Sequence, residues 1–171
     1  MAEKRLAIFT SGQGSTVENG PLHAVESGRL QMDIALIISS IKNSRIVQLA
    51  SSRDIKTVEV LPKELSERFD DVVDLLVRES GANVGVLMGW KEKIADKTIE
   101  RLDLVAGTHP SRLPEFARGY GLTPYAAAWK LSQLDPSVKD TEVVVQRLYP
   151  GRGWDEGPIL GRRLVPIFKT D

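Results

Sequence analysis

The stretch Leu102–Pro114, LDLVAGTHPSRLP, decides the fold class expected for this chain. An apolar run leads to a Gly-Thr pair and then to His109, after which two prolines mark turns. This order predicts a buried strand that ends at His109, where a loop begins. Ligand crevices of open α/β sheets lie at the carboxyl ends of their strands, which makes His109 a candidate site residue. The alternative, a histidine held in its loop by backbone hydrogen bonds, stays open on this stretch alone.

The composition is typical of a globular protein and excludes several classes of partner. The 171 residues are 42% hydrophobic and 27% charged, a length at which one domain buries a substantial core. Lys plus Arg number 23, as do Asp plus Glu, which argues against nucleic acid or a membrane as partner. The lack of cysteine rules out disulfides and fits a reducing compartment. The N-terminal apolar run is too short for a signal peptide or a membrane span, so we expect a cytoplasmic protein with a single domain over residues 1–171.

The N-terminal segment has the pattern of a strand followed by a turn and a helix. The expected strand at 5–10 runs into SGQGST, residues 11–16, and a helix-length segment follows at 16–27. Glycines let the backbone approach an anion, and a helix N-terminus turns free N–H groups toward it. The segment is neither GxGxxG nor a P-loop, and taken alone it is more simply an ordinary turn capped by Ser15 or Thr16.

The rest of the chain alternates between strand and helix patterns. Further strands are expected at 32–39, 56–61, 84–88, 142–148 and 161–168, and helices at 43–51, 63–79, 91–101 and 126–134. The early strands are nearly continuous apolar runs, as expected when helices cover both faces of a sheet. The last two strands have no helix between them. We therefore predict an α/β fold, a mostly parallel doubly wound sheet with an antiparallel edge.

Several polar features are expected at one edge of this sheet. The loop Gly12–Thr16, the segment Gly89–Ile94 and His109 all follow parallel strands, whose carboxyl ends meet at one crevice. Asp155 lies in the glycine-rich loop 149–158, which is long enough to bring its carboxylate to the same place. A histidine beside a carboxylate forms a proton shuttle, and an anion-binding loop nearby favours a phosphorylated substrate.

Four collinear segments resemble the folate-dependent formyltransferases, in particular the branch that formylates glycinamide ribonucleotide (GAR). They are IFTSGQGST (8–16), VGVLMGW (84–90), THPSRLP (108–114) and WDEGPIL (154–160), and they span nearly the whole chain. The resemblance implies a Rossmann-like formyltransferase fold. It also implies transfer of a formyl group from the co-substrate 10-formyltetrahydrofolate to the amine of GAR in purine biosynthesis, without a metal or a covalent enzyme intermediate.

The resemblance also implies roles for individual residues. His109 is the imidazole that moves protons and stabilises the oxyanion, and Asp155 is the carboxylate that orients it. The expected ligands of the substrate phosphate are Gly12, Gln13, Gly14 and Ser15. The expected folate-binding residues are Gly89, Trp90, Lys93, Ile94 and Trp154. The implied partners are small molecules, and a homodimer is a possible assembly.

The sequence departs from the family pattern at the proposed site. Gly107 stands where the family has the Asn of an Asn-x-His motif, whose amide donates to the oxyanion. Thr108 is one residue away and would point to the other face of a strand, whereas Lys93 or a water molecule is an alternative donor. The chain ends at Asp171 without the family's C-terminal helical region. Two further hypotheses therefore stay open: an enzyme that uses another amine or hydrolyses formyltetrahydrofolate, and a weakly active or inactive module that binds a phosphorylated ligand.

Overall fold

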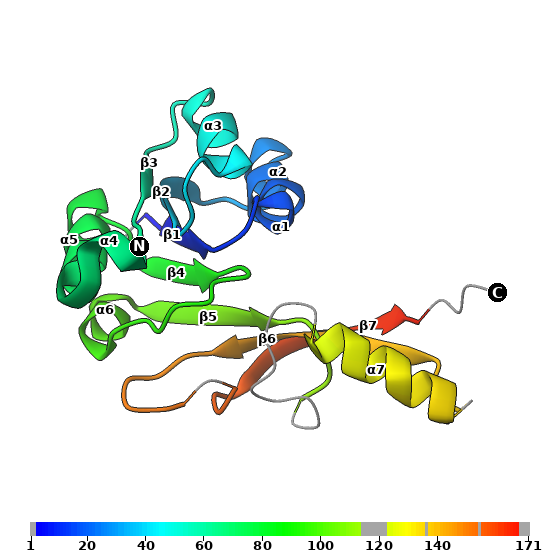
Figure 1. The fold of residues 1–171 in the computed structure, drawn as a ribbon. Helices are drawn as coiled ribbons and strands as arrows, with labels where there is room; N and C mark the ends of the chain where they lie inside the picture. Colours follow the sequence, from blue (N-terminus) through cyan, green and yellow to red (C-terminus); the bar gives the residue numbers. More distant parts are fainter. Residues whose placement is uncertain (1–2, 114–122, 136, 154, 168–171) are drawn as a thin grey trace. The chain divides into compact units, whose positions relative to one another are not determined.

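The computed structural model describes residues 3–113, 123–135, 137–153 and 155–167, and Figure 1 shows them as a ribbon. The chain falls into two compact units, Met1–Val105 and Ala106–Asp171. Strand β5 (Leu104–His109) starts in the first unit and ends in the second.

The first unit contains a parallel sheet. Its four complete strands are β1 (Arg5–Thr10), β2 (Asp33–Ser39), β3 (Thr57–Glu59) and β4 (Val84–Leu87). Strand β1 pairs in parallel with β2 and with β4, and β2 pairs in parallel with β3. The start of β5 lies beside β4, because a Cβ added to Gly85 would be 3.6 Å from Cγ2 of Val105.

The helices of the first unit connect these strands. They are α1 (Ser15–Val17), a π-helix (Glu18–Leu22), α2 (His23–Glu26), α3 (Arg45–Ser51), α4 (Pro62–Leu65), a 3₁₀ turn (Ser66–Arg68), α5 (Phe69–Ser80) and α6 (Asp96–Arg101). Helices α1, α2 and α3 lie on one face of the sheet, and α5 and α6 lie on the other (Figure 1). The first unit therefore has the doubly wound arrangement that the sequence predicts.

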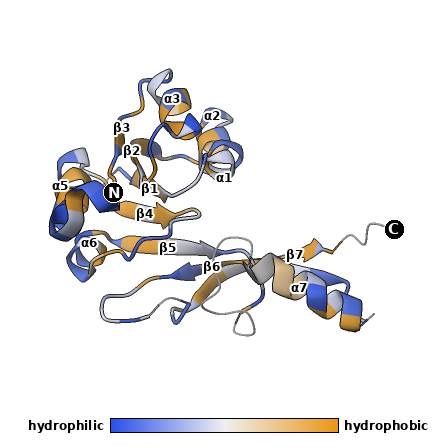
Figure 2. Ribbon diagram, viewed as in Figure 1, coloured by the Kyte–Doolittle hydropathy of each residue, from blue (hydrophilic) through white to orange (hydrophobic). Residues whose placement is uncertain are grey.

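The core of the first unit explains why its strands are apolar without alternation. In β1, Leu6 to Phe9 are all at most 2% exposed, because helices cover both faces of the sheet. One cluster on the side of the N-terminal helices consists of Leu6, Ile8, Val17, Leu22, Ile37, Ile46 and Ala50. Figure 2 shows the contrast with α5, on which apolar and polar residues alternate because only one side of the helix is buried.

Three predicted helices differ from those observed. The helix expected at 16–27 is interrupted at Gly20 (φ −99°, ψ −105°), because the following Pro21 has no N–H to donate. The long helix expected at 63–79 is divided at Ser66, whose φ is 46°. Of the segment 91–101, only Asp96–Arg101 is helical. Apolar spacing alone did not reveal these local breaks.

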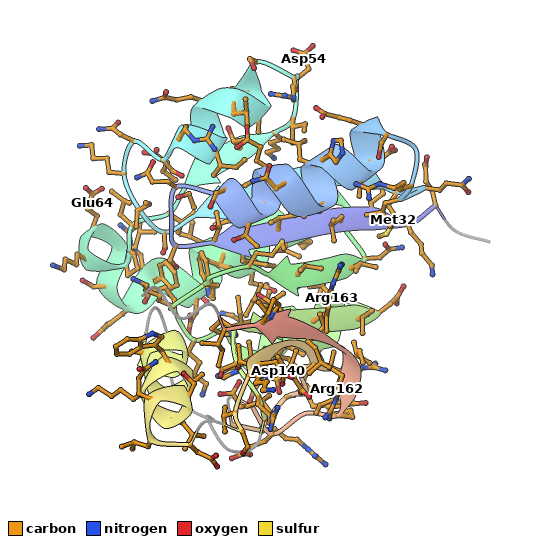
Figure 3. All side chains as sticks on the ribbon, turned by 90° about the vertical axis from the view of Figure 1, so that its right-hand side faces the viewer. Met32, Asp54, Glu64, Asp140, Arg162 and Arg163 are labelled. Carbon is orange, nitrogen blue, oxygen red and sulfur yellow. The ribbon has the colours of Figure 1, made fainter. Side chains whose placement is uncertain are left out.

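The second unit contains the end of β5, helix α7 (Thr123–Leu134) and strands β6 (Asp140–Arg147) and β7 (Ile159–Pro166). Strand β6 pairs antiparallel with both β5 and β7, which confirms the predicted antiparallel edge. The strand order is therefore β3-β2-β1-β4-β5-β6-β7. The last strand is exposed from Ile159 to Leu164, and its adjacent Arg162 and Arg163 point to opposite sides (Figure 3).

One ion pair between helices gives a prediction about stability and pH. Arg101 on α6 donates two hydrogen bonds of 2.8 Å to the carboxylate of Asp74 on α5. The hydrogen bond from Arg101, and secondarily the charges of Arg101 and Lys97, lower the pKa of Asp74 below its ordinary value. A lowered folded-state pKa stabilises the fold above the unfolded-state pKa, and this stabilisation is lost as the pH falls through the folded-state pKa.

We therefore expect Asp74→Asn to lower the urea midpoint of unfolding at about pH 7, and the difference from the wild type to shrink as the pH falls below the unfolded-state pKa. The matched control is Asp71→Asn, since Asp71 pairs with Lys97 but is 72% exposed, and its effect should be smaller at neutral pH. A difference between Asp74→Asn and the wild type that persists unchanged in acid would contradict this account of the pair.

Candidate active site

His109 is the last residue of β5 and is only 3% exposed. Its Nδ1 lies 2.9 Å from the carbonyl oxygen of Ser111 and 3.3 Å from the amide nitrogen of the same residue. The shorter contact requires a proton on Nδ1, so Nδ1–H donates to the carbonyl, and in the neutral ring the lone pair is then on Nε2. Ser111 is itself fixed by a 3.0 Å hydrogen bond between its hydroxyl and that of Thr141 on β6.

Nε2 of His109 faces Asp155. Oδ2 of Asp155 lies 3.7 Å from Nε2, and the two side chains are 4% and 7% exposed. This separation is too long for a hydrogen bond, and no described residue offers Nε2 a hydrogen-bond partner. A protonated ring would form a buried ion pair with the carboxylate here. The two residues that the sequence singled out as a proton shuttle therefore lie side by side within the second unit.

The loop between β6 and β7 holds Asp155 in an unusual conformation. Asp155 has φ 63°, in the left-handed region that few residues other than glycine and Asn or Asp adopt. Just after it, Gly157 packs so tightly on the end of β6 that an added Cβ would lie 1.6 Å from the carbonyl oxygen of Arg147. The side chain of Glu156 closes the loop by accepting a 2.9 Å hydrogen bond from the N–H of Gly153. The resulting turn directs the Asp155 carboxylate toward His109.

Gly107 lies two residues before His109 and therefore on the same face of β5. Its partner across the ladder is Gln146 of β6, and an added Cβ would lie 2.9 Å from Cδ1 of Leu148. Gln146 is 4% exposed and donates a 2.6 Å hydrogen bond from Nε2 to Oδ1 of Asp155. The sequence analysis did not find Gln146, because only the register of β5 and β6 places it opposite Gly107.

The predicted phosphate loop follows β1 in the first unit. Gly14 has φ 84°, and a Cβ there would lie 2.2 Å from Cβ of Ile46 on α3, so a glycine is required. Oε1 of Gln13 accepts a 3.0 Å hydrogen bond from the N–H of Arg45 at the start of α3. Ser15 is the first residue of α1, and Gly12 has open space at its Cβ position.

Charges of both signs lie beside this loop. Arg45 forms an ion pair with Glu18, and the hydrogen bond from the guanidinium lowers the pKa of the Glu18 carboxyl below its ordinary value. The positive charge of Arg45 is therefore already paired. The role of Gly12, Gln13, Gly14 and Ser15 in binding phosphate stays a prediction.

A second segment of the first unit lies at the same edge of the sheet as this loop. The Ser11 hydroxyl accepts hydrogen bonds from the N–H of Lys91, at 2.9 Å, and from the hydroxyl of Ser40, at 2.7 Å. These contacts join the segments that follow β1, β2 and β4. They bring the loop at Gly12 and the segment at Gly89 together, as the sheet topology predicts. The sequence signal missed here was a serine directly after β1 and another directly after β2.

The residues expected to bind folate fall into two groups. Trp90 is 6% exposed and packs edge-on against Phe9 and face-on against Phe69, and Ile94 is 4% exposed. Gly89, with φ 68° and open space around it, and the exposed Lys93 are accessible instead. Trp154 lies outside the described residues. Trp90 and Ile94 are buried and support the segment, and the role of the expected residues in binding folate stays a prediction.

Among the described residues, no group of three His, Cys, Asp or Glu side chains is placed to hold a metal ion. No helix in that part of the chain has the length and apolar character needed to cross a membrane.

Comparison with known proteins identifies the family. A model of the formyl transferase family matches residues 4–171, and the chain therefore belongs to this family. No curated protein is significantly similar in sequence. Together with the fold, this membership confirms the resemblance found in the sequence and establishes the chain as an enzyme of the formyltransferase class.

Solved structures of similar fold include enzymes with two kinds of activity. Phosphoribosylglycinamide formyltransferase from Bacillus halodurans has a TM-score of 0.79 and 26% identity, over 98% of this chain and 82% of that chain. Glycinamide ribonucleotide transformylase 1 from Geobacillus kaustophilus has a TM-score of 0.82 and 24% identity, over 99% and 86%. A formyltetrahydrofolate deformylase from Pseudomonas syringae has a TM-score of 0.78 and 25% identity, over 97% of this chain and 52% of that chain.

Proposed function

We propose that this chain transfers the formyl group of 10-formyltetrahydrofolate to the primary amine of GAR. The observation that carries the proposal is the buried pair of His109 and Asp155 at the end of β5, in a chain of the formyl transferase family. The similarity to phosphoribosylglycinamide formyltransferase supports GAR as the acceptor.

The reaction exchanges one bond of the formyl carbon for another. The amine nitrogen forms a bond to the formyl carbon, the bond from that carbon to the folate nitrogen N10 breaks, and one proton moves from the amine to N10. His109 can carry this proton on Nε2, because its Nδ1 is already engaged by the Ser111 carbonyl. In its protonated form the ring donates to the oxygen of the formyl group as negative charge develops there.

Asp155 completes the proposed machinery. Its Oδ2 stabilises the positive charge of the ring whenever Nε2 holds a proton, and it fixes the orientation of the imidazole. At 3.7 Å the carboxylate stabilises this charge without accepting the Nε2 proton in a hydrogen bond, so the proton can be passed to the substrate. The Asp155 carboxylate is not a nucleophile in this scheme.

Each substrate has a proposed binding segment in the first unit. The backbone of Gly12, Gln13 and Gly14 would bind the phosphate of GAR, and Gly14 fits because its positive φ allows the tight turn. Gly89 and Lys93 would contact the folate, since they are the exposed ones among the described residues expected to bind it. We propose small molecules as the only ligands of this site.

Hydrolysis of formyltetrahydrofolate is the second candidate function. It is favoured by the similarity to the deformylase from Pseudomonas syringae, which covers 97% of this chain. The same His109 and Asp155 would then activate a water molecule in place of an amine. The two functions differ in the acceptor and not in the groups that carry the proton.

An assay that follows both products separates the two functions. The purified chain is incubated with 10-formyltetrahydrofolate, with and without GAR, and formyl-GAR, formate and tetrahydrofolate are measured by mass spectrometry. We expect tetrahydrofolate and formyl-GAR in equal amounts, formed only when GAR is present. Equal rates of formate release with and without GAR would favour the deformylase, and an intact formyl donor under both conditions would overturn both candidates.

A further inference from the structure

Gln146 is a buried amide in a position where packing alone would favour an apolar side chain. It lies on β6, is 4% exposed, and shares its face of the strand with Val144, which is fully buried. A buried polar group destabilises the fold unless it makes hydrogen bonds. Gln146 makes one such bond, from Nε2 to Oδ1 of Asp155, at 2.6 Å.

The amide can make this contact in only one orientation. A carboxylate accepts hydrogen bonds and does not donate them, so the NH₂ group must face Asp155 and the carbonyl oxygen must point away. In that orientation Oε1 is buried and has no hydrogen-bond partner among the described residues. The bond to Asp155 is therefore kept although it leaves an unsatisfied acceptor, which argues for a function beyond packing.

The geometry also explains what the bond achieves. With Oδ1 held by Gln146, the carboxylate of Asp155 directs its other oxygen, Oδ2, to Nε2 of His109. The backbone contributes strain at this point, because Asp155 has φ 63°. Gln146 lies opposite Gly107 in the β5–β6 ladder, and so on the strand next to the one that ends at His109.

We propose, on the basis of the function proposed above, that Gln146 is a positioning residue that holds the Asp155 carboxylate in place for proton transfer at His109. It acts through Asp155 and does not touch the reacting atoms. Removal of its donor group should therefore change the rate of the chemical step and leave substrate binding unchanged.

The test compares Gln146→Leu and Gln146→Met with the wild type. Both variants replace the amide with an apolar side chain of similar size and so remove the Nε2 donor. Either variant suffices if the other fails to fold. We expect kcat to fall about 10- to 100-fold, as for other residues that orient a catalytic group, while KM for both substrates stays within about twofold. The melting temperature should fall modestly, because Oδ1 of the buried Asp155 carboxylate loses its donor.

A double-mutant cycle distinguishes positioning from a general structural effect. In the Asp155→Ala background, Gln146→Leu should have no further effect on kcat, because the group through which Gln146 acts is missing. Additive losses in the double variant would overturn the proposal, and so would an unchanged kcat in both single variants.

A second readout does not depend on activity. The chain has two histidines, and His23 on α2 is exposed, so NMR signals of the two imidazoles can be compared within one sample. Gln146→Leu should shift the His109 signals and leave those of His23 in place. Unchanged His109 signals in Gln146→Leu would overturn the positioning role. If the variant shifts these signals but the wild-type chain shows no formyl transfer, the positioning role holds and only the proposed function is overturned.

Discussion

Replacing His109 with alanine should lower the rate of formyl transfer by about 10²- to 10⁴-fold, the range typical for loss of a general acid or base. Among the described residues no other imidazole lies there, because the ring is buried at the end of β5 with Nε2 facing Asp155 and the second histidine, His23, is on α2. The change also removes the partner of the Ser111 carbonyl. The measurement is kcat/KM with 10-formyltetrahydrofolate and GAR, after circular dichroism has shown that the variant is folded.

The matched control is His23→Ala. His23 is exposed on α2, and its substitution should leave the rate unchanged. Turnover in the folded His109→Ala variant at the wild-type rate would remove His109 from the mechanism.

Gly157→Ala should strongly disturb the second unit. The new methyl group would lie 1.6 Å from the carbonyl oxygen of Arg147, so the backbone must move at one side or the other. Overpacking of buried positions typically costs about 1–3 kcal/mol of unfolding free energy, and a contact with backbone cannot be relieved by rotating a side chain. Because Asp155 is two residues away, the movement should also displace its carboxylate and lower kcat. Urea unfolding and steady-state kinetics measure the two effects.

Gly161→Ala provides the control within the same hairpin. Gly161 lies on β7, has open space at its Cβ position and has no positive φ, so alanine should be accepted with little change in stability or rate. Equal behaviour of the two variants would mean that the loop between β6 and β7 relaxes without cost.

The sequence predicts the strands better than the helices. Continuous apolar runs such as Leu6–Phe9 and Leu36–Ile38 indicated strands covered on both faces, and each lies within an observed parallel strand. The breaks at Gly20 and Ser66 were missed, because apolar spacing persists through a local change of backbone conformation. The single domain expected over residues 1–171 stays a prediction.

The residues of the candidate site also divide into some that the sequence predicts and others that it does not. His109 was predicted from its place after an apolar strand, and its contact with Asp155 followed from the length of the loop and from the family resemblance. Gln146 could not be predicted, because a shift of the β5–β6 pairing by one residue would turn it to the other face. The substrate-binding roles of the residues in the first unit stay predictions.

Strand β7 has features that oppose aggregation of the protein. It is the last strand in the described sheet and exposes both faces from Ile159 to Leu164, an arrangement that in general invites other chains to add strands. Arg162, which forms an ion pair with Glu142, and Arg163 place a charged side chain on each face, and Pro166 removes a backbone donor at the end of the strand. Copies that met along this edge would have to accommodate these arginines, which protect the exposed strand against fibrous aggregation.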